Sequence, residues 1–569
     1  MAKMVKKKKK KKYGASRFGG GGAGGSGGGK SDLRPKFVEK TPPCTDKCPN
    51  HNNIREALRI VASSEKQGRS YDESLEAAWH IFTETSPFPA VCGRVCPHGC
   101  ETACNRAEVD GAVGINAFER AVGDFGIEKG LKLTRLTEEK HEEKVAVVGA
   151  GPAGMSCAFH LARRGYPVTV FEGFPKAGGM LRYGIPPYRL PREVIDAEVN
   201  NILELGVELK CNTSVGTDTS FDDLKNDYKA VFMGIGAHKG RMLRVEGEDA
   251  PNVWTGAEFL HRLNSGEKVE VGDKVIVIGG GDSAIDAARA SRRLGADVRI
   301  IYRRTIEEMP AYSHEVAAAQ DEGIQIDFLA APSAIELDDD GKAKAMTCIR
   351  MELGEPDDSG RRRPVPVEGS EFSVETTTII AAISQEPDFE HLENLREGRD
   401  WLKVDSHQKM LKFEDVYAGG DALDLATVIK AIAQGKEAAI TIDASLRGKD
   451  RPRGPWDDYA VIKHDKMKLS FYEKAERHEV PELPVEERFT DGMDKEVALG
   501  LSRDDAIAEA KRCMSCGHCM DCESCWMYCT PAAVVKPDKP GGTYAFKLEL
   551  CDGCKKCAEE CPCGYIEMF

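Results

Sequence analysis

The 569-residue sequence has no long apolar run. Its longest apolar runs, such as 144–148 and 275–278, have the length of buried strands, whereas a membrane-spanning helix needs about 20 apolar residues. The N-terminus also lacks the apolar core of a secretory signal peptide. We therefore expect a cytoplasmic protein, with neither a membrane nor a nucleic acid as its partner.

Cysteine is scarce in the middle of the chain. Only three of the 20 cysteines fall between residues 105 and 512, whereas six lie at 44–104 and eleven at 513–563. Disulfides are rare in a reducing compartment, where cysteines at short spacings are typical of metal or cluster ligands. Both ends of the chain are therefore predicted to bind metal.

Basic residues are unevenly distributed. Residues 1–12 contain eight lysines and precede a glycine-rich stretch at 14–29. Without these lysines, 71 basic residues remain against 93 acidic ones, so the net charge becomes more negative than −14. This composition predicts a disordered tail over residues 1–35, because it offers little apolar surface to bury. The alternative is an electrostatic tether to an acidic partner protein.

The length of the chain predicts several domains. We expect an α/β protein with two Rossmann-type domains, the second inserted in the first, flanked by a helical iron–sulfur domain and a ferredoxin-like α+β module. The predicted parts are the tail, a helical domain with two cysteine groups (36–140), a first nucleotide-binding domain (141–265 and 385–450), a second nucleotide-binding domain (266–384), a connector (451–511) and a cysteine-rich module (512–569).

The first nucleotide-binding unit has a glycine-rich turn between a strand and a helix. The strand 144–148 precedes Gly-Ala-Gly-Pro-Ala-Gly, and a second strand, 167–171, ends in an acid. Glycines let the backbone approach a pyrophosphate at a helix N-terminus, and the acid accepts hydrogen bonds from ribose hydroxyls. The predicted FAD-binding residues here are Gly149, Gly151, Pro152, Ala153, Gly154 and Glu172.

The second unit repeats this arrangement but ends in two cations. Strand 274–278 leads into Gly-Gly-Gly-Asp-Ser-Ala, and strand 297–302 is followed by Arg303 and Arg304. Guanidinium groups pair with a 2′-phosphate, which favours NADP(H) over NAD(H). The alternative is a solvated arginine pair at a strand end. The predicted nicotinamide-nucleotide residues are Gly279, Gly281, Asp282, Ser283, Ala284, Arg303 and Arg304.

Three further segments resemble parts of two-dinucleotide flavoproteins. The segments are 178–186, which resembles a loop lining the flavin, 234–237, which resembles the crossover between domains, and 416–421 with the helix that follows it. The resemblance implies that the N-terminus of that helix points at the flavin ring, where its positive end stabilises negative charge. It adds Gly178, Gly179, Leu181, Arg182, Gly236, Gly420, Asp421 and Thr427 to the predicted flavin site.

Two cysteine runs near the C-terminus have the spacing of a two-cluster ferredoxin. Each run reads Cys-x2-Cys-x2-Cys-x3-Cys, and the fourth cysteine of each run binds the other cluster. A zinc site would need only four of these eight cysteines. The predicted ligands are Cys519, Cys522, Cys525 and Cys561 for one [4Fe–4S] cluster, and Cys551, Cys554, Cys557 and Cys529 for the other.

The N-terminal cysteines resemble the cluster domain of the glutamate synthase small-subunit family. The likeness covers about residues 40–450 and implies two more [4Fe–4S] clusters. One is expected to bind Cys48, Cys96, Cys100 and Glu119, although Glu119 taken without the resemblance reads as a surface helix residue. The other is expected to begin with Cys44 and Cys104.

That last cluster lacks half of its ligands near the N-terminus. The family's upstream Arg-Cys-x2-Cys segment is absent, but Arg-Cys-Met-Ser-Cys at 512–516 has the same form. We therefore expect Cys513 and Cys516 to complete the cluster, from the same chain or from the partner in a homodimer.

These cofactors predict an enzyme, an NAD(P)H:acceptor oxidoreductase with FAD and four [4Fe–4S] clusters. A flavin converts two-electron hydride chemistry into one-electron cluster chemistry, so no acid–base residue is singled out as catalytic. The whole arrangement resembles sulfite-reductase-associated iron–sulfur flavoproteins (the DsrL type). This resemblance implies that the chain reduces NAD(P)+ with electrons from dissimilatory sulfite reductase during sulfur oxidation. The alternatives are a glutamate synthase small (beta) subunit, an NAD(P)H:ferredoxin oxidoreductase, and a relay that binds no nicotinamide.

Overall fold

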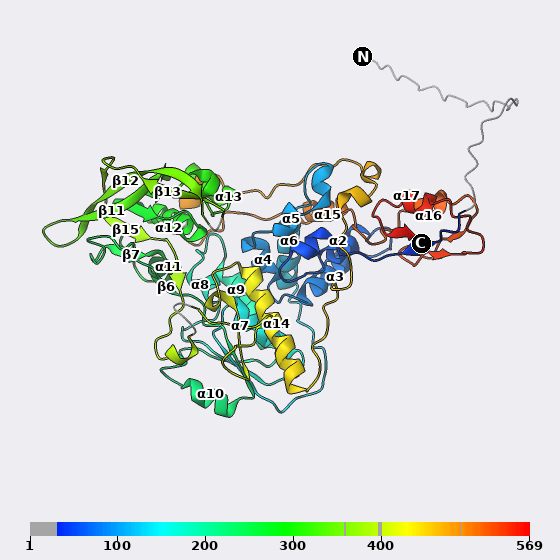
Figure 1. The fold of residues 1–569 in the computed structure, drawn as a ribbon, viewed down its shortest axis with the longest axis horizontal. Coiled ribbons are helices and arrows are strands. Elements are labelled where there is room, and N and C mark those ends of the chain that lie inside the picture. Colours follow the sequence, from blue (N-terminus) through cyan, green and yellow to red (C-terminus); the bar gives the residue numbers. More distant parts are fainter. Residues whose placement is uncertain (1–30, 358–359, 397–400, 491) are drawn as a thin grey trace, which may run out of the picture.

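The computed structural model describes residues 31–357, 360–396, 401–490 and 492–569, so the predicted tail falls largely outside the described residues. A helical domain lies at the centre, one sheet-containing domain lies below it, another lies to its left, and the C-terminal module lies to its right (Figure 1). The predicted mixed α/β fold class is confirmed. Within the described residues, no helix is long and apolar enough to cross a membrane.

The N-terminal domain is helical. Its third helix begins at a capping box between Ser70 and Glu73, and its fourth begins with Pro89, which is favoured in a first helical turn. The helices are α1 (Pro43–Lys47), α2 (Ile54–Ala62), α3 (Tyr71–Thr83), α4 (Pro89–Val95), α5 (Gly99–Thr102), the 3₁₀ turn η1 (Asn105–Glu108) and α6 (Ile115–Glu128). One buried core continues from these helices into the first sheet domain.

The first sheet is parallel, with strand order β17-β5-β2-β3-β4. Its central strands are buried along their whole length, as expected for a sheet covered on both faces. The strands are β2 (Val145–Val148), β3 (Val168–Phe171), β4 (Glu208–Lys210), β5 (Ala230–Met233) and β17 (Val416–Ala418). The helices are α7 (Pro152–Ala162), α8 (Met180–Tyr183), α9 (Arg192–Leu203), α10 (Phe221–Asp227) and α14 (Val428–Leu446), with the 3₁₀ turn η4 (Gly420–Ala422) before α14.

The second sheet is inserted between β5 and β17 and has the order β10-β9-β8-β15-β7. The strands are β7 (Val253–Thr255), β8 (Lys274–Ile278), β9 (Asp297–Tyr302), β10 (Gln325–Phe328) and β15 (Thr378–Ala381), with α11 (Gly256–Asn264), α12 (Asp282–Arg293) and α13 (Ser313–Asp321). Because β7 pairs with β15, the predicted boundary at residue 265 is wrong and the second domain begins before β7. Two short strands, β6 (Lys239–Gly240) and β16 (Gln385–Glu386), pair where the chain crosses between the domains.

An antiparallel sheet is attached to the second domain between β10 and β15. It contains β11 (Ala330–Leu337), β12 (Ala343–Pro356), β13 (Arg362–Pro366) and β14 (Phe372–Glu375). The β12–β13 pair is a hairpin whose turn includes Asp357 and Arg361. The sequence analysis did not anticipate this sheet.

The C-terminal module has its own small core and includes segments from both the N-terminal and the C-terminal part of the chain. It contains α16 (Ser524–Met527), α17 (Lys556–Glu559), β18 (Val534–Val535), β19 (Ala545–Phe546) and β20 (Ile566–Met568), and α15 (Arg503–Lys511) precedes it. Strand β1 (Pro35–Phe37) pairs antiparallel with β20. The predicted boundary at residue 36 is therefore also displaced, because β1 belongs to the module rather than to the helical domain.

Candidate functional site

A cavity of about 660 Å³ opens at the C-terminal ends of β2, β3 and β5. This is the edge of a parallel sheet where dinucleotides bind. Eleven of the predicted flavin-site residues line it: Gly149, Gly151, Pro152, Ala153, Glu172, Gly179, Leu181, Gly236, Gly420, Asp421 and Thr427.

The glycines of the first turn are required by close approach of the backbone. Gly149 has φ +94°, and a Cβ there would lie 2.3 Å from the Gly234 carbonyl oxygen. A Cβ at Gly154 would lie 1.9 Å from the Gly149 carbonyl oxygen. Gly151 has no such obstruction within 3.5 Å and lines the cavity, so a pyrophosphate can approach its backbone.

Two acids, Glu172 and Asp421, line this cavity. Burial raises the pKa of Glu172, whose carboxylate accepts hydrogen bonds from the backbone N–H groups of Ala150 (2.7 Å) and Phe174 (2.9 Å). Burial also raises the pKa of Asp421, to about 6. Asp421 precedes α14, whose N-cap is Thr427, and Thr427 lines the cavity, so the N-terminus of the long helix faces it.

Three predicted flavin residues lie outside the cavity lining. Gly154 packs beneath the turn, and Gly178 lies against the Arg182 side chain. Arg182 is buried and its guanidinium donates to the Ala177 carbonyl oxygen and pairs with Asp196. These residues shape the loop rather than contact the cavity, and the loop motif alone could not distinguish the two roles.

A second cavity, of about 880 Å³, lies at the C-terminal ends of β8 and β9. Its lining includes Gly279, Gly281, Asp282, Ser283, Arg303 and Arg304 from the predicted set, but not Ala284. A Cβ at Gly280 would lie 2.4 Å from the Tyr302 ring, so only glycine lets this turn pack against β9. The predicted nucleotide turn is thus exposed to the cavity.

The two cavities meet. Six residues line both of them: Met180, Ile185, Asp421, Ala426, Thr427 and Val428. Val95 and Pro97 also line the second cavity and flank Cys96 of the helical domain. Ligands in the two cavities would therefore approach each other beside the first N-terminal cysteine group.

That first group gathers Cys48, Cys96, Cys100 and Glu119. Burial and the Glu119 carboxylate raise the pKa of Cys96 to about 12, and burial with the thiols of Cys44, Cys48 and Cys96 raises the pKa of Cys100. Glu119 is 6% exposed, and burial raises its pKa to about 8. Its Oε1 has no hydrogen-bond partner in the described part of the chain, although most buried polar atoms have one.

The second group joins both ends of the chain. Cys44, Cys104, Cys513 and Cys516 line one small cavity. Burial and the other three thiols raise the pKa of Cys44, and burial raises the pKa of Cys513 to about 11. All four cysteines come from the same chain, so the arrangement predicted from the sequence does not require a second subunit.

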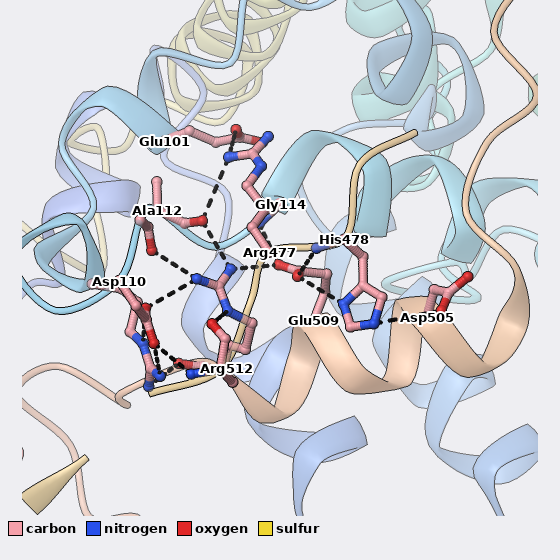
Figure 2. A network of polar contacts seen from close by, with 12 residues as sticks. Glu101, Asp110, Ala112, Gly114, Arg477, His478, Asp505, Glu509 and Arg512 are labelled. Carbon is pink, nitrogen blue, oxygen red and sulfur yellow. Dashed lines mark hydrogen bonds and ion pairs between the residues drawn. The ribbon is translucent and has the colours of Figure 1, made fainter. Parts of the chain in front are cut away.

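A buried polar network holds this composite group together (Figure 2). Arg512 pairs with Asp110 (3.0 Å) and with Glu509 (2.9 Å), and Arg106 pairs with Asp110 (2.6 Å) and donates to the Arg512 carbonyl oxygen. Glu509 also accepts from the Gly114 N–H (2.7 Å) at the start of α6. The segment after Cys104 is thereby fixed to the segment before Cys513, and the sequence motifs gave no sign of this network.

The C-terminal module forms two further groups. Cys519, Cys522, Cys525 and Cys561 line one cavity, which Cys563 also reaches, and Cys529, Cys551, Cys554 and Cys557 line another. The cysteines of each predicted set therefore share a cavity. Cys554 is exposed, so the second group lies at the surface.

Tyr472 of the connector lies between the composite group and the module. Burial raises its pKa, as do the thiols of Cys563, Cys516 and Cys513 in turn. Its hydroxyl donates to the Met514 carbonyl oxygen at 2.9 Å. Across the described residues, no group of three or more His, Cys, Asp or Glu side chains has the geometry to hold a single metal ion.

Two adjoining nucleotide cavities beside clustered cysteines define a flavin- and nicotinamide-dependent iron–sulfur oxidoreductase. The chain belongs to the pyridine nucleotide-disulphide oxidoreductase family, whose profile matches residues 143–435. A profile for dihydropyrimidine dehydrogenase domain II, with a 4Fe–4S cluster, matches residues 38–131.

Three relatives narrow the family. The chain is 37% identical to the beta subunit of NADPH-Fe(3+) oxidoreductase from Geobacter sulfurreducens over 84% of this chain and 76% of that one. It is 38% identical to the beta subunit of NADP(+)-dependent formate dehydrogenase from Moorella thermoacetica over 84% and 70%. It is 36% identical to the small chain of NADPH glutamate synthase from Escherichia coli over 70% and 87%. The predicted membership of the glutamate synthase small-subunit-like FAD and NAD(P)H iron–sulfur oxidoreductases is confirmed.

Proposed function

We propose that this oxidoreductase carries four [4Fe–4S] clusters and reduces NAD(P)+ with electrons that dissimilatory sulfite reductase releases during sulfur oxidation. The observation that carries the cluster count is the gathering of all sixteen predicted ligands into four groups. The first group lies beside the second nucleotide cavity, which Val95 and Pro97 line, and the last group includes the exposed Cys554.

The chain's own residues hold and orient the nucleotides in this proposal. Backbone N–H groups around Gly151 would donate to the FAD pyrophosphate, Glu172 would accept hydrogen bonds from the ribose, and the N-terminus of α14 would face the flavin ring. Bound there, the flavin would exchange a hydride with the nicotinamide and single electrons with the clusters. Asp421 and Val428, which line both cavities, would hold the two rings in position.

The cluster ligands fit the same proposal. Thiolates bind iron in such clusters, and the unpaired Oε1 of buried Glu119 supplies the fourth ligand of the first group. The composite group offers four buried thiols around one cavity, with the ion pairs of Arg512 holding its two halves together.

Iron content tests the composite group. A Cys513→Ala/Cys516→Ala variant is expected to hold about twelve iron atoms per chain instead of about sixteen, because each cubane contributes four. Cys211→Ala, a half-buried cysteine outside all four groups, is the matched control and should keep all of them. Full iron content in the double variant would overturn the composite cluster.

The choice of partner is supported by the resemblance to sulfite-reductase-associated flavoproteins and by the exposed group at Cys554. The test mixes the purified protein with purified dissimilatory sulfite reductase, sulfide and NAD(P)+, and measures NAD(P)H formation. We expect formation that is lost in Cys551→Ala/Cys554→Ala, while NAD(P)H-dependent ferricyanide reduction remains. Formation without the sulfite reductase, or none with it, contradicts this partner.

A glutamate synthase subunit is the second candidate, because the Escherichia coli small chain is matched over 87% of its length. Recovery of a glutamine-hydrolysing synthase with the protein from native extract would favour it. Against it, the match to that small chain spans 70% of this chain, whereas the matches to the other two relatives span 84%.

A further inference from the structure

We propose that Arg361, in the turn of the β12–β13 hairpin, forms with Arg303 the binding site for the 2′-phosphate of NADP(H), and that Arg304 is a positioning residue. The inference rests on the proposed function in one respect, which is that the second cavity binds the nicotinamide nucleotide.

The three arginines converge on one part of the cavity. Arg303 and Arg304 follow the C-terminal end of β9, where the adenosine ribose is recognised in such folds. Arg361 comes from the attached antiparallel sheet and lines the same cavity. Burial raises the pKa of Tyr302, and the positive charges of Arg304, Arg361 and Arg303 oppose that rise.

Arg304 is already engaged with protein groups. It is 4% exposed, its Nη2 pairs with Asp357 at 2.7 Å, and its Nε donates to the Arg362 carbonyl oxygen at 2.7 Å. A guanidinium offers a rigid fork of donors, and here that fork is directed at both sides of the hairpin turn. Arg304 therefore fixes the hairpin against the end of β9.

The anchored turn sets the position of Arg361. The Asp357 N–H donates to the Arg361 carbonyl oxygen at 2.8 Å, and the Asp357 carbonyl oxygen accepts from Gly360 at 2.8 Å. Asp357 thus connects Arg304 to the backbone of Arg361. A displaced hairpin would carry Arg361 away from the cavity.

Arg303 and Arg361 have exposed side chains at the cavity, in contrast to Arg304. Guanidinium groups bind phosphate through paired charge-assisted hydrogen bonds, and two of them can neutralise a dianion. The equivalent position in the first unit is the acid Glu172, which would repel that phosphate. The site therefore favours NADP(H) over NAD(H), and its second cation comes from a segment that no nucleotide motif includes.

Direct binding of 2′,5′-ADP and 5′-ADP to the flavin-loaded protein, measured by calorimetry, tests this site. Wild type is expected to bind 2′,5′-ADP more tightly. Arg361→Gln and Arg303→Gln should each weaken 2′,5′-ADP binding by about tenfold or more and leave 5′-ADP within about twofold. Arg363→Gln, an exposed arginine on the same hairpin, is the matched control and should change neither ligand.

The positioning role has a separate readout. Asp357→Asn removes a negative charge beside the proposed phosphate site, so a purely electrostatic effect would tighten 2′,5′-ADP binding. If Asp357 and Arg304 hold the hairpin, Asp357→Asn weakens 2′,5′-ADP binding instead. Arg304→Lys should also bind 2′,5′-ADP more weakly than wild type, because a lysine lacks the fork of the guanidinium group. Tighter binding in Asp357→Asn would overturn the positioning role.

The binding measurements distinguish failure of the Arg361 site from failure of the proposed function. Unchanged 2′,5′-ADP binding in Arg361→Gln, or equal binding of the two ligands by wild type, overturns the Arg361 site alone. Binding of neither ligand by wild type that retains its flavin would show that the second cavity is not the nucleotide site, which would overturn the proposed function as well.

Discussion

The C-terminal module draws both of its cysteine groups from residues 519–561, whereas the composite group combines Cys44 and Cys104 with Cys513 and Cys516. In the module, short turns between the cysteines place the thiols, and a small core of its own surrounds them. In the composite group, placement depends on buried ion pairs and on helix packing between segments far apart in the sequence.

This difference has a physical consequence. Closing a short loop costs little entropy, so the module's ligands stay near one another even before the domain is complete. The composite group needs the helical domain, the connector and α15 to be assembled first. We therefore expect variants of the Arg512 network to affect the composite group selectively, and variants of the module's packing to affect the module selectively.

Arg512→Met should produce the largest effect. The Arg512 side chain is 2% exposed, and its loss removes one ion-pair partner from each of the buried carboxylates of Asp110 and Glu509, at a cost of about 3–5 kcal/mol. We expect lower stability in urea and loss of about four iron atoms per chain, with the module's eight retained. Lys511→Met, at the exposed neighbouring position, should change neither quantity appreciably. Equal iron loss from the module would contradict the expected difference between the composite group and the module.

Glu198 on α9 should have an effect of intermediate size on the free energy of unfolding, and this effect depends on pH. Its carboxylate accepts hydrogen bonds from Ala90 (2.7 Å) and Val91 (3.0 Å) at the start of α4, and burial raises its pKa to about 8. The folded state therefore holds a proton that the unfolded state releases above about pH 4.3, so stability falls as pH rises towards 8. The fall is about 1.4 kcal/mol per pH unit inside this window.

Urea unfolding at pH 6 and pH 8 measures that dependence. Wild type should lose about 2–3 kcal/mol between these values, and Glu198→Gln, which cannot titrate, should lose much less. Glu193→Gln, at an exposed position on the same helix, should follow wild type. Parallel pH dependence in wild type and Glu198→Gln would rule out Glu198 as the source.

Phe37→Ala should produce the smallest effect and should be confined to the module. The ring of Phe37 on β1 stacks on the rings of Phe546 and Tyr565, with centroid distances of 4.5 Å and 5.2 Å. Phe37 also lines the cavity of the module group that begins with Cys519. Losing this half-buried ring should cost about 2 kcal/mol. The expected readout is faster loss of iron from the module in urea, with Lys36→Ala, the exposed neighbour on β1, as the control. Loss of composite-group iron first would contradict the independence of the two regions.

The nucleotide domains were predictable from the sequence because their motifs are local. A glycine-rich turn between a strand and a helix specifies the backbone that approaches a pyrophosphate, and β8 and β9 have the predicted bounds. The boundary between the two domains was predicted wrongly, since β7 carries no motif and joins the second sheet only by pairing with β15.

The roles of individual side chains within a predicted motif were harder to predict from the sequence. Arg182 and Arg304 were both predicted to bind cofactors, and both have their donors directed at protein groups. Arg361 was not predicted, because its place at the cavity depends on how the hairpin packs against β9. A motif fixes the backbone near a ligand, but the direction of a long side chain depends on neighbours from elsewhere in the chain.

The sequence by itself determined the chemistry of this protein: two nucleotide-binding turns, sixteen residues suited to four clusters, and the absence of long apolar runs. It also predicted that Cys513 and Cys516 complete the group begun by Cys44 and Cys104. Only the tertiary structure decided that one chain suffices for this, through the Arg106–Asp110–Arg512 contacts, and that β1 joins the C-terminal module. The physical reason is that local spacing selects ligand types and turns, whereas contacts between distant segments form only when burial and charge pairing outweigh the entropy of bringing them together.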